Sequence, residues 1–371
     1  MEEAKGLKGV VAGRTRVSTV GKGVGFRYFG YAVDELTQHC HFEQVAYLLL
    51  YRDLPDREQL ADFQRKVAGF RDLSPALKQV LERLPRDSNP VDVMRTGCSA
   101  LGTLEPEPGH KPEDMAIRLL GSFASILLYW HHFVTSSKRI SCVTAPEDSV
   151  VLHFLKLLTQ SPNHDPLVVK ALDVSLILYA EHEFSTSTYV ARMAASTLSD
   201  YYSCVTAAIG ALRGPLHGGA NEGALKLLEG FKSPSDALEK VELMRKRKQL
   251  FMGFGHRIYK GADPRAALIK DYAQQLTSKP FGQRKLFTIA EAMEGYLLRE
   301  AGIAANMDLY VAVTYRQCGI PAAYFPCLFV IARTPGWTAH ISEQRGDNKL
   351  LKPLLRYSGP APREVSARAK L

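Results

Sequence analysis

The sequence lacks the features that define several large protein classes. Its longest apolar runs, such as residues 322–332, fall short of the ~18–20 residues that span a bilayer. The six cysteines are scattered without a Cys-x-x-Cys pair, so neither a zinc knuckle nor a thioredoxin motif is indicated. There is no Gly-x-Ser-x-Gly elbow, no Walker A loop and no His-Glu-x-x-His. Together these absences argue against a transmembrane protein, a zinc protease and a P-loop nucleotidase.

The composition is that of a globular protein of one large or two medium domains. The chain has 371 residues, of which 46% are hydrophobic and 23% are charged. The formal net charge of +9 suits a polyanionic partner, such as a nucleotide cofactor or a carboxylate substrate. Scattered cysteines and the absence of an apolar signal segment at the start predict reduced thiols and a cytoplasmic location.

Helical periodicity dominates the chain. Leu60, Phe63, Val67 and Phe70 fall on one helical face. Three pairs combine an N-cap residue with proline at the first helical position, at residues 74–75, 89–90 and 233–234. No Asn-Gly or Asp-Gly pair is present to signal a hairpin, and only residues 7–33 could form a small ribbon. The sequence therefore predicts a mainly α-helical protein.

Two glycine-rich segments each contain a histidine. His217 lies within residues 214–223 and His256 within residues 253–265, and Asp308 follows downstream. A helix N-terminus lowers the pKa of a histidine, and the neutral imidazole can donate a hydrogen bond to a carbonyl. A carboxylate among apolar groups becomes a stronger base. Two neutral histidines and one base suit proton abstraction next to a carbonyl, followed by attack on a second carbonyl.

Two arginines and a basic run leave alternatives open. Arg265 and Arg333 lie among apolar or glycine-rich segments, where an arginine binds a substrate carboxylate or forms a structural salt bridge. A dicarboxylate or keto-acid substrate would engage both. The run at residues 245–248 is either a solvated helix end or a phosphate-binding group.

Long ordered motifs between residue 9 and about residue 362 resemble the citrate synthase family. They are residues 42–49 (FEQVAYLL), 92–97 (DVMRTG), 125–130 (SILLYW), 179–184 (YAEHEF), 212–222 (LRGPLHGGANE) and 253–256 (GFGH). Residues 336–337 (GW), 339–340 (AH) and 343–345 (EQR) are most similar to the 2-methylcitrate synthase branch.

The resemblance implies an all-α, two-domain homodimer with the active site between the domains. Residues 1–218 and 319–371 would form the large domain, which carries the dimer contacts and the oxaloacetate site. Residues 219–318 would form the smaller domain, with the coenzyme A side and the catalytic aspartate. The domains would close on the substrate.

The resemblance also implies roles for individual residues. His217 would stabilise the enol of the acyl thioester, His256 would polarise the oxaloacetate keto group, and Asp308 would remove the α-proton. Matching positions for oxaloacetate are His182, Arg265, Arg333 and Lys352. Matching positions for coenzyme A are Met252, Gly253, Phe254 and Gly255. No permanently bound cofactor and no metal are implied, and the acyl-CoA is a co-substrate.

Two segments depart from the family pattern. Lys352 precedes Pro353 where the family usually places an arginine that reaches the site across the dimer, and lysine cannot bind a carboxylate bidentately. Residues 185–188 read Ser-Thr-Ser-Thr where the branch usually has Asn-Ala-Ser-Thr. Both changes bear on substrate preference and leave the three catalytic candidates in place.

The reaction expected is the condensation of propionyl-CoA with oxaloacetate to 2-methylcitrate and free coenzyme A. The alternative is citrate synthase using acetyl-CoA. Readings from other classes are a non-catalytic helical scaffold and a basic nucleic-acid binder, but the three catalytic candidates are all present and no recognition motif is found. No membrane partner is expected. The ending Ala369-Lys370-Leu371 resembles a peroxisomal address, the alternative to a cytoplasmic location.

Overall fold

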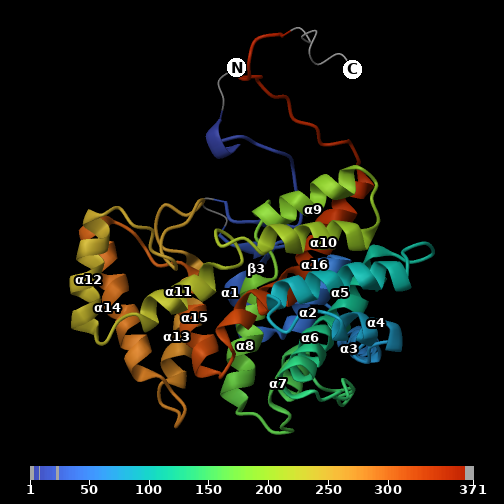
Figure 1. The fold of residues 1–371 in the computed structure, drawn as a ribbon, viewed down its shortest axis with the longest axis horizontal. Helices are drawn as coiled ribbons and strands as arrows, with labels where there is room; N and C mark the ends of the chain where they lie inside the picture. The colour runs from blue at the N-terminus through green and yellow to red at the C-terminus, as the bar shows by residue number, and fades with distance from the viewer. Residues whose placement is uncertain (1–3, 8, 22–24, 364–371) are drawn as a thin grey trace, which may run out of the picture.

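The computed structural model describes residues 4–7, 9–21 and 25–363. Over these residues the chain forms sixteen α-helices, two 3-10 helices and three two-residue strands (Figure 1). The prediction of an all-α protein is therefore confirmed. The tripeptide Ala369-Lys370-Leu371 lies outside the described residues.

The helices account for nearly all of the regular structure. The first eight are α1 (Val33–His39), α2 (Phe42–Tyr51), α3 (Arg57–Gly69), α4 (Pro75–Glu82), α5 (Pro90–Leu104), α6 (Pro112–Ser136), α7 (Val150–Thr159) and α8 (Pro166–Tyr179). The others are α9 (Thr186–Ser196), α10 (Tyr201–Leu212), α11 (Ala220–Glu229), α12 (Pro234–Lys246), α13 (Pro264–Leu276), α14 (Arg284–Ala301), α15 (Met307–Gln317) and α16 (Phe325–Gly346). The 3-10 helices are η1 (Lys5–Leu7) and η2 (Ala322–Tyr324).

The predicted helix starts are confirmed by hydrogen bonds at the caps. The side chain of Ser74 accepts from the N–H of Leu77 at the start of α4, and Asn89 accepts from Val91 at the start of α5. Ser233 caps α12 in the same way. Each cap satisfies a backbone N–H that the helix leaves unpaired, and the following proline has no N–H to satisfy.

The expected ribbon forms within residues 7–33. Strands β1 (Ser18–Thr19), β2 (Arg27–Tyr28) and β3 (Tyr31–Ala32) pair antiparallel in chain order, with Ser18 opposite Tyr28 and Tyr28 opposite Tyr31. The Tyr28 hydroxyl donates to the carbonyls of Ile177 and Glu181, so the ribbon is fastened to the end of α8.

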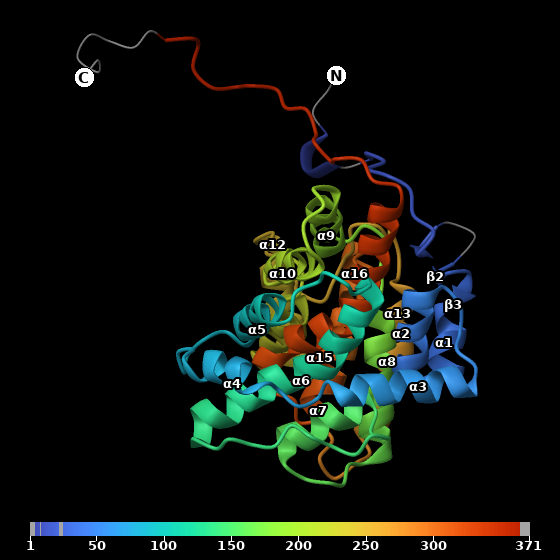
Figure 2. The same ribbon diagram turned by 90° about the vertical axis from the view of Figure 1, so that its right-hand side faces the viewer.

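Helix α16 runs through the middle of the molecule and packs on α2, α6, α8 and α9 (Figure 2). Most of its residues are buried, as are those of α8, and the buried residues of both helices include polar side chains such as Arg333, His340 and Asp173. Helices α11 to α15 gather at one side, where α13 packs on α8 and α11 packs on α16 (Figure 1). No described helix is long and apolar enough to cross a membrane.

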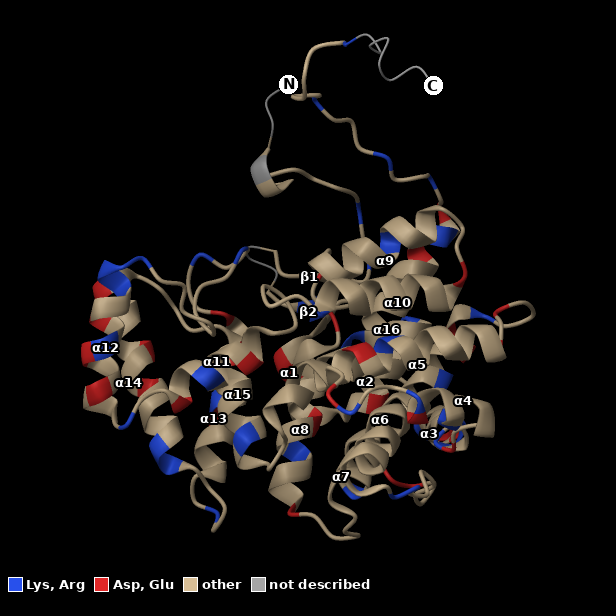
Figure 3. Cartoon of the chain, viewed as in Figure 1, with Lys and Arg blue, Asp and Glu red and all other residues tan. Residues whose placement is uncertain are grey.

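Charge lies mainly on the outer helices. Lysine, arginine and carboxylate side chains alternate along α12 and α14 at the edge of the molecule (Figure 3). After α16 the chain leaves the body as an exposed tail through residue 363 (Figures 1 and 2).

Candidate active site

Asp308 occupies the first turn of α15, where Asn306 caps the helix and accepts the N–H of Asp308 at 2.9 Å. The hydroxyl of Tyr179, at the end of α8, donates to Oδ1 of Asp308 and itself accepts from Asn221 Nδ2 at 3.2 Å. Burial raises the pKa of Asp308, against the lowering effects of the Tyr179 hydrogen bond and the charge of Arg265. Among the described residues nothing donates to Oδ2, which leaves a basic carboxylate oxygen for a ligand.

His217 is held in one tautomer by α9. Its Nε2 lies 2.7 Å from the hydroxyl of Ser187 and 3.3 Å from the Ser187 backbone nitrogen, which can only donate. The indole N–H of Trp337 donates to the same Ser187 oxygen at 3.1 Å, so the hydroxyl proton is directed at His217. Nε2 is therefore an acceptor and the ring proton is on Nδ1. Burial, aided by the charge of Arg333, lowers the pKa of His217 to about 3, so the ring is neutral.

His256 is fixed in the opposite tautomer. Its Nδ1 accepts the backbone N–H groups of Ile258 at 3.1 Å and Tyr259 at 3.3 Å, so the ring proton is on Nε2. Burial and the charge of Arg265 lower the pKa of His256 to about 4. Both histidines thus offer one N–H from an uncharged ring, as an electrophilic role toward a carbonyl requires.

His182 lies beside His256. The two ring centroids are 5.2 Å apart, and Nε2 of His182 lies 3.0 Å from the hydroxyl of Tyr259. The His182 side chain is buried, and burial together with the charges of Arg265 and Arg333 holds its pKa well below the ordinary value. The charges of both arginines act on this neutral histidine, so its surroundings favour an anion.

Arg265 is paired with a carboxylate that the sequence analysis did not single out. Its Nε and Nη2 donate to the two oxygens of Asp263 at 3.0 and 2.8 Å, and both side chains are buried. Asp263 Oδ2 also accepts the backbone N–H of Met307 at 3.1 Å. Nη1 of Arg265 has no acceptor in the described part of the chain, so it can bind a substrate carboxylate.

Arg333 projects from α16 and is 1% exposed. Its Nε donates to the Tyr179 carbonyl at 2.6 Å and its Nη1 to the Ser185 hydroxyl at 2.8 Å. Burial lowers its pKa, and the nearby Glu181 carboxylate opposes that effect. Ser185 is one of the residues that depart from the family pattern, and its hydroxyl accepts a hydrogen bond from this arginine.

Phe329 brings together one group of the predicted residues. Its ring stacks on Tyr179 at 4.2 Å between centroids, meets His217 at 5.4 Å and lies 4.9 Å from the guanidinium carbon of Arg333. Tyr179, His217 and Arg333 are thereby packed around a single aromatic ring, and Tyr179 holds Asp308. The other group, formed by His182, His256 and Arg265, is connected to the start of α15 through Asp263, whose Oδ2 accepts from both Arg265 and the backbone N–H of Met307.

The predicted coenzyme A loop packs on the start of α15. Asn306 N–H donates to the Gly253 carbonyl at 2.9 Å, Gly255 N–H donates to Ala304, and Asn306 Nδ2 donates to the Gly255 carbonyl. Gly253 has φ of +86°, and a Cβ there would lie 3.1 Å from Cα of Leu309, so glycine is required. The side chains of Met252 and Phe254 pack against the hydrophobic core. The loop is therefore next to the helix that carries Asp308.

Lys352 is the one predicted site residue that this chain does not bring to the others. It lies in the exposed tail that follows α16 (Figure 2).

Several residues of the site were missed by sequence reasoning. Tyr179, Ser187, Trp337, Tyr259 and Asp263 orient the predicted residues without being singled out. Only Asp263 carries a local signal, because it directly precedes Pro264 at a helix start and lies two residues from Arg265. The others meet their partners through contacts between distant parts of the chain.

The fold and site define an all-α enzyme of the acyltransferase type, in which Asp308, two neutral histidines and two buried arginines are linked by shared contacts. The family described as "Citrate synthase, C-terminal domain" matches residues 6–354, and the chain belongs to the citrate synthase family. A protein of Shewanella oneidensis named 2-methylcitrate synthase is 47% identical over 97% of this chain and 96% of its own length.

Other relatives agree on the family and differ in the named reaction. A protein of Synechocystis named citrate synthase is 36% identical over 96% of this chain and 90% of its own. A solved citrate synthase of Thermoplasma acidophilum, in a ternary complex with carboxymethyl coenzyme A and oxaloacetate, has a TM-score of 0.90 at 31% identity. The match covers 100% of this chain and 99% of the solved chain. The described residues of this chain contain no group of three or more His, Cys, Asp and Glu side chains placed to hold a metal.

Proposed function

We propose that this enzyme condenses propionyl-CoA with oxaloacetate and hydrolyses the thioester, giving 2-methylcitrate and free coenzyme A. The observation that carries the reaction type is the pair of fixed tautomers: Nδ1–H of His217 and Nε2–H of His256 are both free to donate to carbonyl oxygens. The named relative in Shewanella oneidensis supports the choice of propionyl-CoA.

The first chemical step is proton transfer. Asp308 takes the α-proton of the acyl thioester through Oδ2, while Nδ1–H of His217 donates to the thioester oxygen as the enol forms. A free carboxylate is far too weak a base for this proton, and one preorganised donor of this kind supplies about 3–4 kcal/mol. The raised pKa of Asp308 strengthens it as the base.

Carbon–carbon bond formation follows. The enol carbon attacks the keto carbon of oxaloacetate, while Arg265 and Arg333 bind the carboxylates. The keto oxygen is polarised by Nε2–H of His256 and becomes a hydroxyl, so over the condensation the proton lost from the α-carbon is balanced by the one gained at this oxygen. Water then attacks the thioester carbonyl of the condensed product, and the carbon–sulfur bond breaks to release the thiol and a new carboxylate. Closure of residues 219–318 on residues 1–218 and 319–371 would exclude water until condensation is complete.

We also propose that the enzyme is a homodimer in which each subunit adds a residue to the active site of the other. Lys352 of one subunit would add a charge beside Arg333 of the other, consistent with its place in a tail that leaves its own body. As a point charge, lysine would give weaker and less oriented carboxylate binding than arginine.

Release of free thiol from propionyl-CoA and acetyl-CoA, with and without oxaloacetate, tests the proposal. We expect oxaloacetate-dependent release with both donors and a higher kcat/KM for propionyl-CoA. One methylene discriminates by only ~1–3 kcal/mol, so some activity with acetyl-CoA is expected. A preference for acetyl-CoA would favour citrate synthase, which the relative in Synechocystis supports. Equal release without oxaloacetate would indicate a thioesterase.

The cellular location stays a prediction. A reporter carrying Ala369-Lys370-Leu371 at its end, expressed in a eukaryotic cell, should be punctate if the tail is a peroxisomal address. Diffuse fluorescence would leave the cytoplasmic prediction.

A further inference from the structure

One side chain in the loop between α12 and α13 contacts three residues assigned to oxaloacetate, although the proposed reaction gives it no role. The hydroxyl of Tyr259 lies 3.0 Å from Nε2 of His182. Its ring centroid lies 4.6 Å from that of His256 and 6.0 Å from the guanidinium carbon of Arg265. Tyr259 is therefore the common neighbour of two histidines and one arginine.

The hydroxyl of Tyr259 is the donor in its bond with His182. Burial raises the pKa of Tyr259, so the phenol keeps its proton. Burial and the charges of two arginines keep the His182 ring neutral, and the backbone carbonyl of His182 favours a proton on the nearer ring nitrogen, Nδ1. Nε2 of His182 thus carries a lone pair, which accepts the proton of the Tyr259 hydroxyl.

The backbone around His182 is held without Tyr259. The Ser18 hydroxyl donates to Oε1 of Glu181 at 3.0 Å and accepts the backbone N–H of Glu183 at 2.9 Å. These two bonds fix the residues before and after His182. In the described part of the chain, Tyr259 is the only other residue that hydrogen-bonds the His182 ring, so loss of the hydroxyl would affect the ring and not the backbone.

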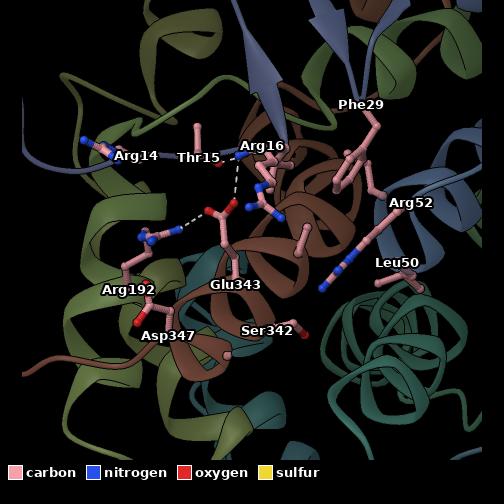
Figure 4. A pocket seen from close by; sticks show the side chains of 14 residues that line it. Arg14, Thr15, Arg16, Phe29, Leu50, Arg52, Arg192, Ser342, Glu343 and Asp347 are labelled. Carbon is pink, nitrogen blue, oxygen red and sulfur yellow. Dashed lines mark hydrogen bonds and ion pairs between the residues drawn. The ribbon is translucent and has the colours of Figure 1, made fainter.

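A buried network extends this support to α9 and α16. Nη1 of Arg192 donates to Nδ1 of His340 at 3.1 Å, so His340 carries its proton on Nε2, which donates to Oε1 of Glu181 at 2.9 Å. Arg192 is held in turn by Oε2 of Glu343, at 2.7 Å (Figure 4). The residue before His182 is therefore connected to two long helices, whereas Tyr259 approaches the ring from a separate loop.

A lone pair on Nε2 without a donor would compete with the substrate for an arginine. The charges of Arg265 and Arg333 both act on the His182 ring. Nη1 of Arg265 has no acceptor among the described residues and is free to bind a carboxylate. Without the Tyr259 proton, Nε2 would draw this N–H group away from the substrate, because a buried acceptor is costly to leave unpaired. The hydroxyl thus keeps the pocket preorganised for an anion.

We propose that Tyr259 is a positioning residue for oxaloacetate, an inference that rests on the proposed function. Its hydroxyl donates to Nε2 of His182 and leaves the N–H groups of Arg265 available for the carboxylates of the substrate. The backbone N–H of Tyr259 also donates to Nδ1 of His256 at 3.3 Å. One residue therefore orients the anion-binding side of the pocket through its side chain and the keto-polarising histidine through its backbone.

Tyr259→Phe tests the hydroxyl alone, because the ring and the backbone bond to His256 remain. Oxaloacetate binding is measured by calorimetry without acyl-CoA, and kcat and KM are measured by thiol release. We expect the Kd and the KM for oxaloacetate to rise about fivefold and kcat to stay within about twofold of the wild type. The matched control Tyr324→Phe removes a hydroxyl that lies 2.5 Å from Nδ1 of His131, and it should keep the wild-type constants.

The protonation of His182 gives a second readout, which a loss of packing alone would not change. Nitrogen NMR of protein labelled at histidine should show His182 with its proton on Nδ1 and a hydrogen-bonded Nε2. His182→Gln identifies the signal by its absence, and Tyr259→Phe should shift the Nε2 resonance while the His256 resonances stay in place. A proton on Nε2 of His182 in the wild type would overturn the inference, whether or not Tyr259→Phe folds.

The binding results separate this inference from the proposed function. Wild-type Kd and KM in Tyr259→Phe, or an equal rise in Tyr324→Phe, would overturn the positioning role. A fall in kcat with an unchanged Kd would also overturn it, because the hydroxyl would then serve the chemical step. If the wild type binds oxaloacetate but releases no thiol, the proposed function fails, whereas a weaker Kd in Tyr259→Phe would still support the role of Tyr259 in binding this keto acid.

Discussion

Ser185 and Ser187 lie two residues apart at the start of α9, yet they contact different parts of the site. The Ser187 hydroxyl donates to Nε2 of His217, whereas the Ser185 hydroxyl accepts from Nη1 of Arg333. Replacement of each by alanine removes one oxygen atom. We predict that Ser187→Ala lowers kcat, and that Ser185→Ala raises the KM for oxaloacetate.

The magnitude for Ser187→Ala follows from the hydrogen bonds that remain. The Ser187 backbone N–H still donates to Nε2 at 3.3 Å, so the tautomer of His217 is weakened and not abolished. A net contribution of about 1–1.4 kcal/mol for the lost hydroxyl corresponds to a five- to tenfold lower kcat. The indole N–H of Trp337 also loses its acceptor, so the free energy of unfolding should fall by ~1–3 kcal/mol.

The assay is steady-state thiol release at saturating acyl-CoA with varied oxaloacetate. Ser185→Ala should raise the oxaloacetate KM about fivefold with little change in kcat, because it removes an acceptor that orients Arg333. Thermal unfolding of both variants checks that the fold is kept. If Ser187→Ala left kcat unchanged, or if both variants changed the same parameter, the assignment of His217 Nδ1–H as the donor would be refuted.

Three further predictions follow from the same structure. Asp308→Asn should lower kcat by ~10³ while isothermal titration shows oxaloacetate binding within a few fold of the wild type; a comparable loss of both would contradict its role as base. The folded protein keeps His217 neutral, with a pKa of about 3, whereas the unfolded chain takes up a proton below about pH 6.5. Tm should therefore fall as pH drops from about 6.5 toward 4, and His217→Gln should reduce that slope, an unchanged slope being the contrary result. Gly336→Ala should lower Tm and the affinity for oxaloacetate, because its Cβ would lie 2.3 Å from the Ala180 carbonyl; wild-type values for both would contradict the close packing described here.

Helix starts could be predicted from the sequence because their signal is local. Ser74, Asn89 and Ser233 accept from N–H groups two or three residues away, and the proline that follows each fixes the backbone. The start of α10 carries a weaker local signal. Asp200 caps this helix in the same manner, but no proline follows it. Capping by aspartate without a following proline is common in loops as well, so it is less specific.

The catalytic candidates could be predicted from the sequence, but the contacts that fix their protonation and orientation could not. Each of His217 and His256 stands in a recognisable glycine-rich segment, whereas the protonated nitrogen of His217 depends on Ser187, which is 30 residues away. The base depends likewise on Tyr179, 129 residues before it. Such pairs are determined by the packing of α8, α9 and α15, and no local pattern encodes them.

The carboxylate of Asp263 holds two groups that the proposed function assigns to different substrates. One of its oxygens accepts from both Arg265, the proposed ligand of the keto acid, and the backbone of Met307, the residue before the proposed base. If binding of the keto acid displaced the arginine, this single side chain would transmit the movement to the first turn of α15. Variants selected for a different keto acid would be expected to alter the surroundings of Arg265 while retaining Asp263. Loss of Asp263 would remove a hydrogen-bond acceptor from Arg265 and from the helix turn that carries Asp308.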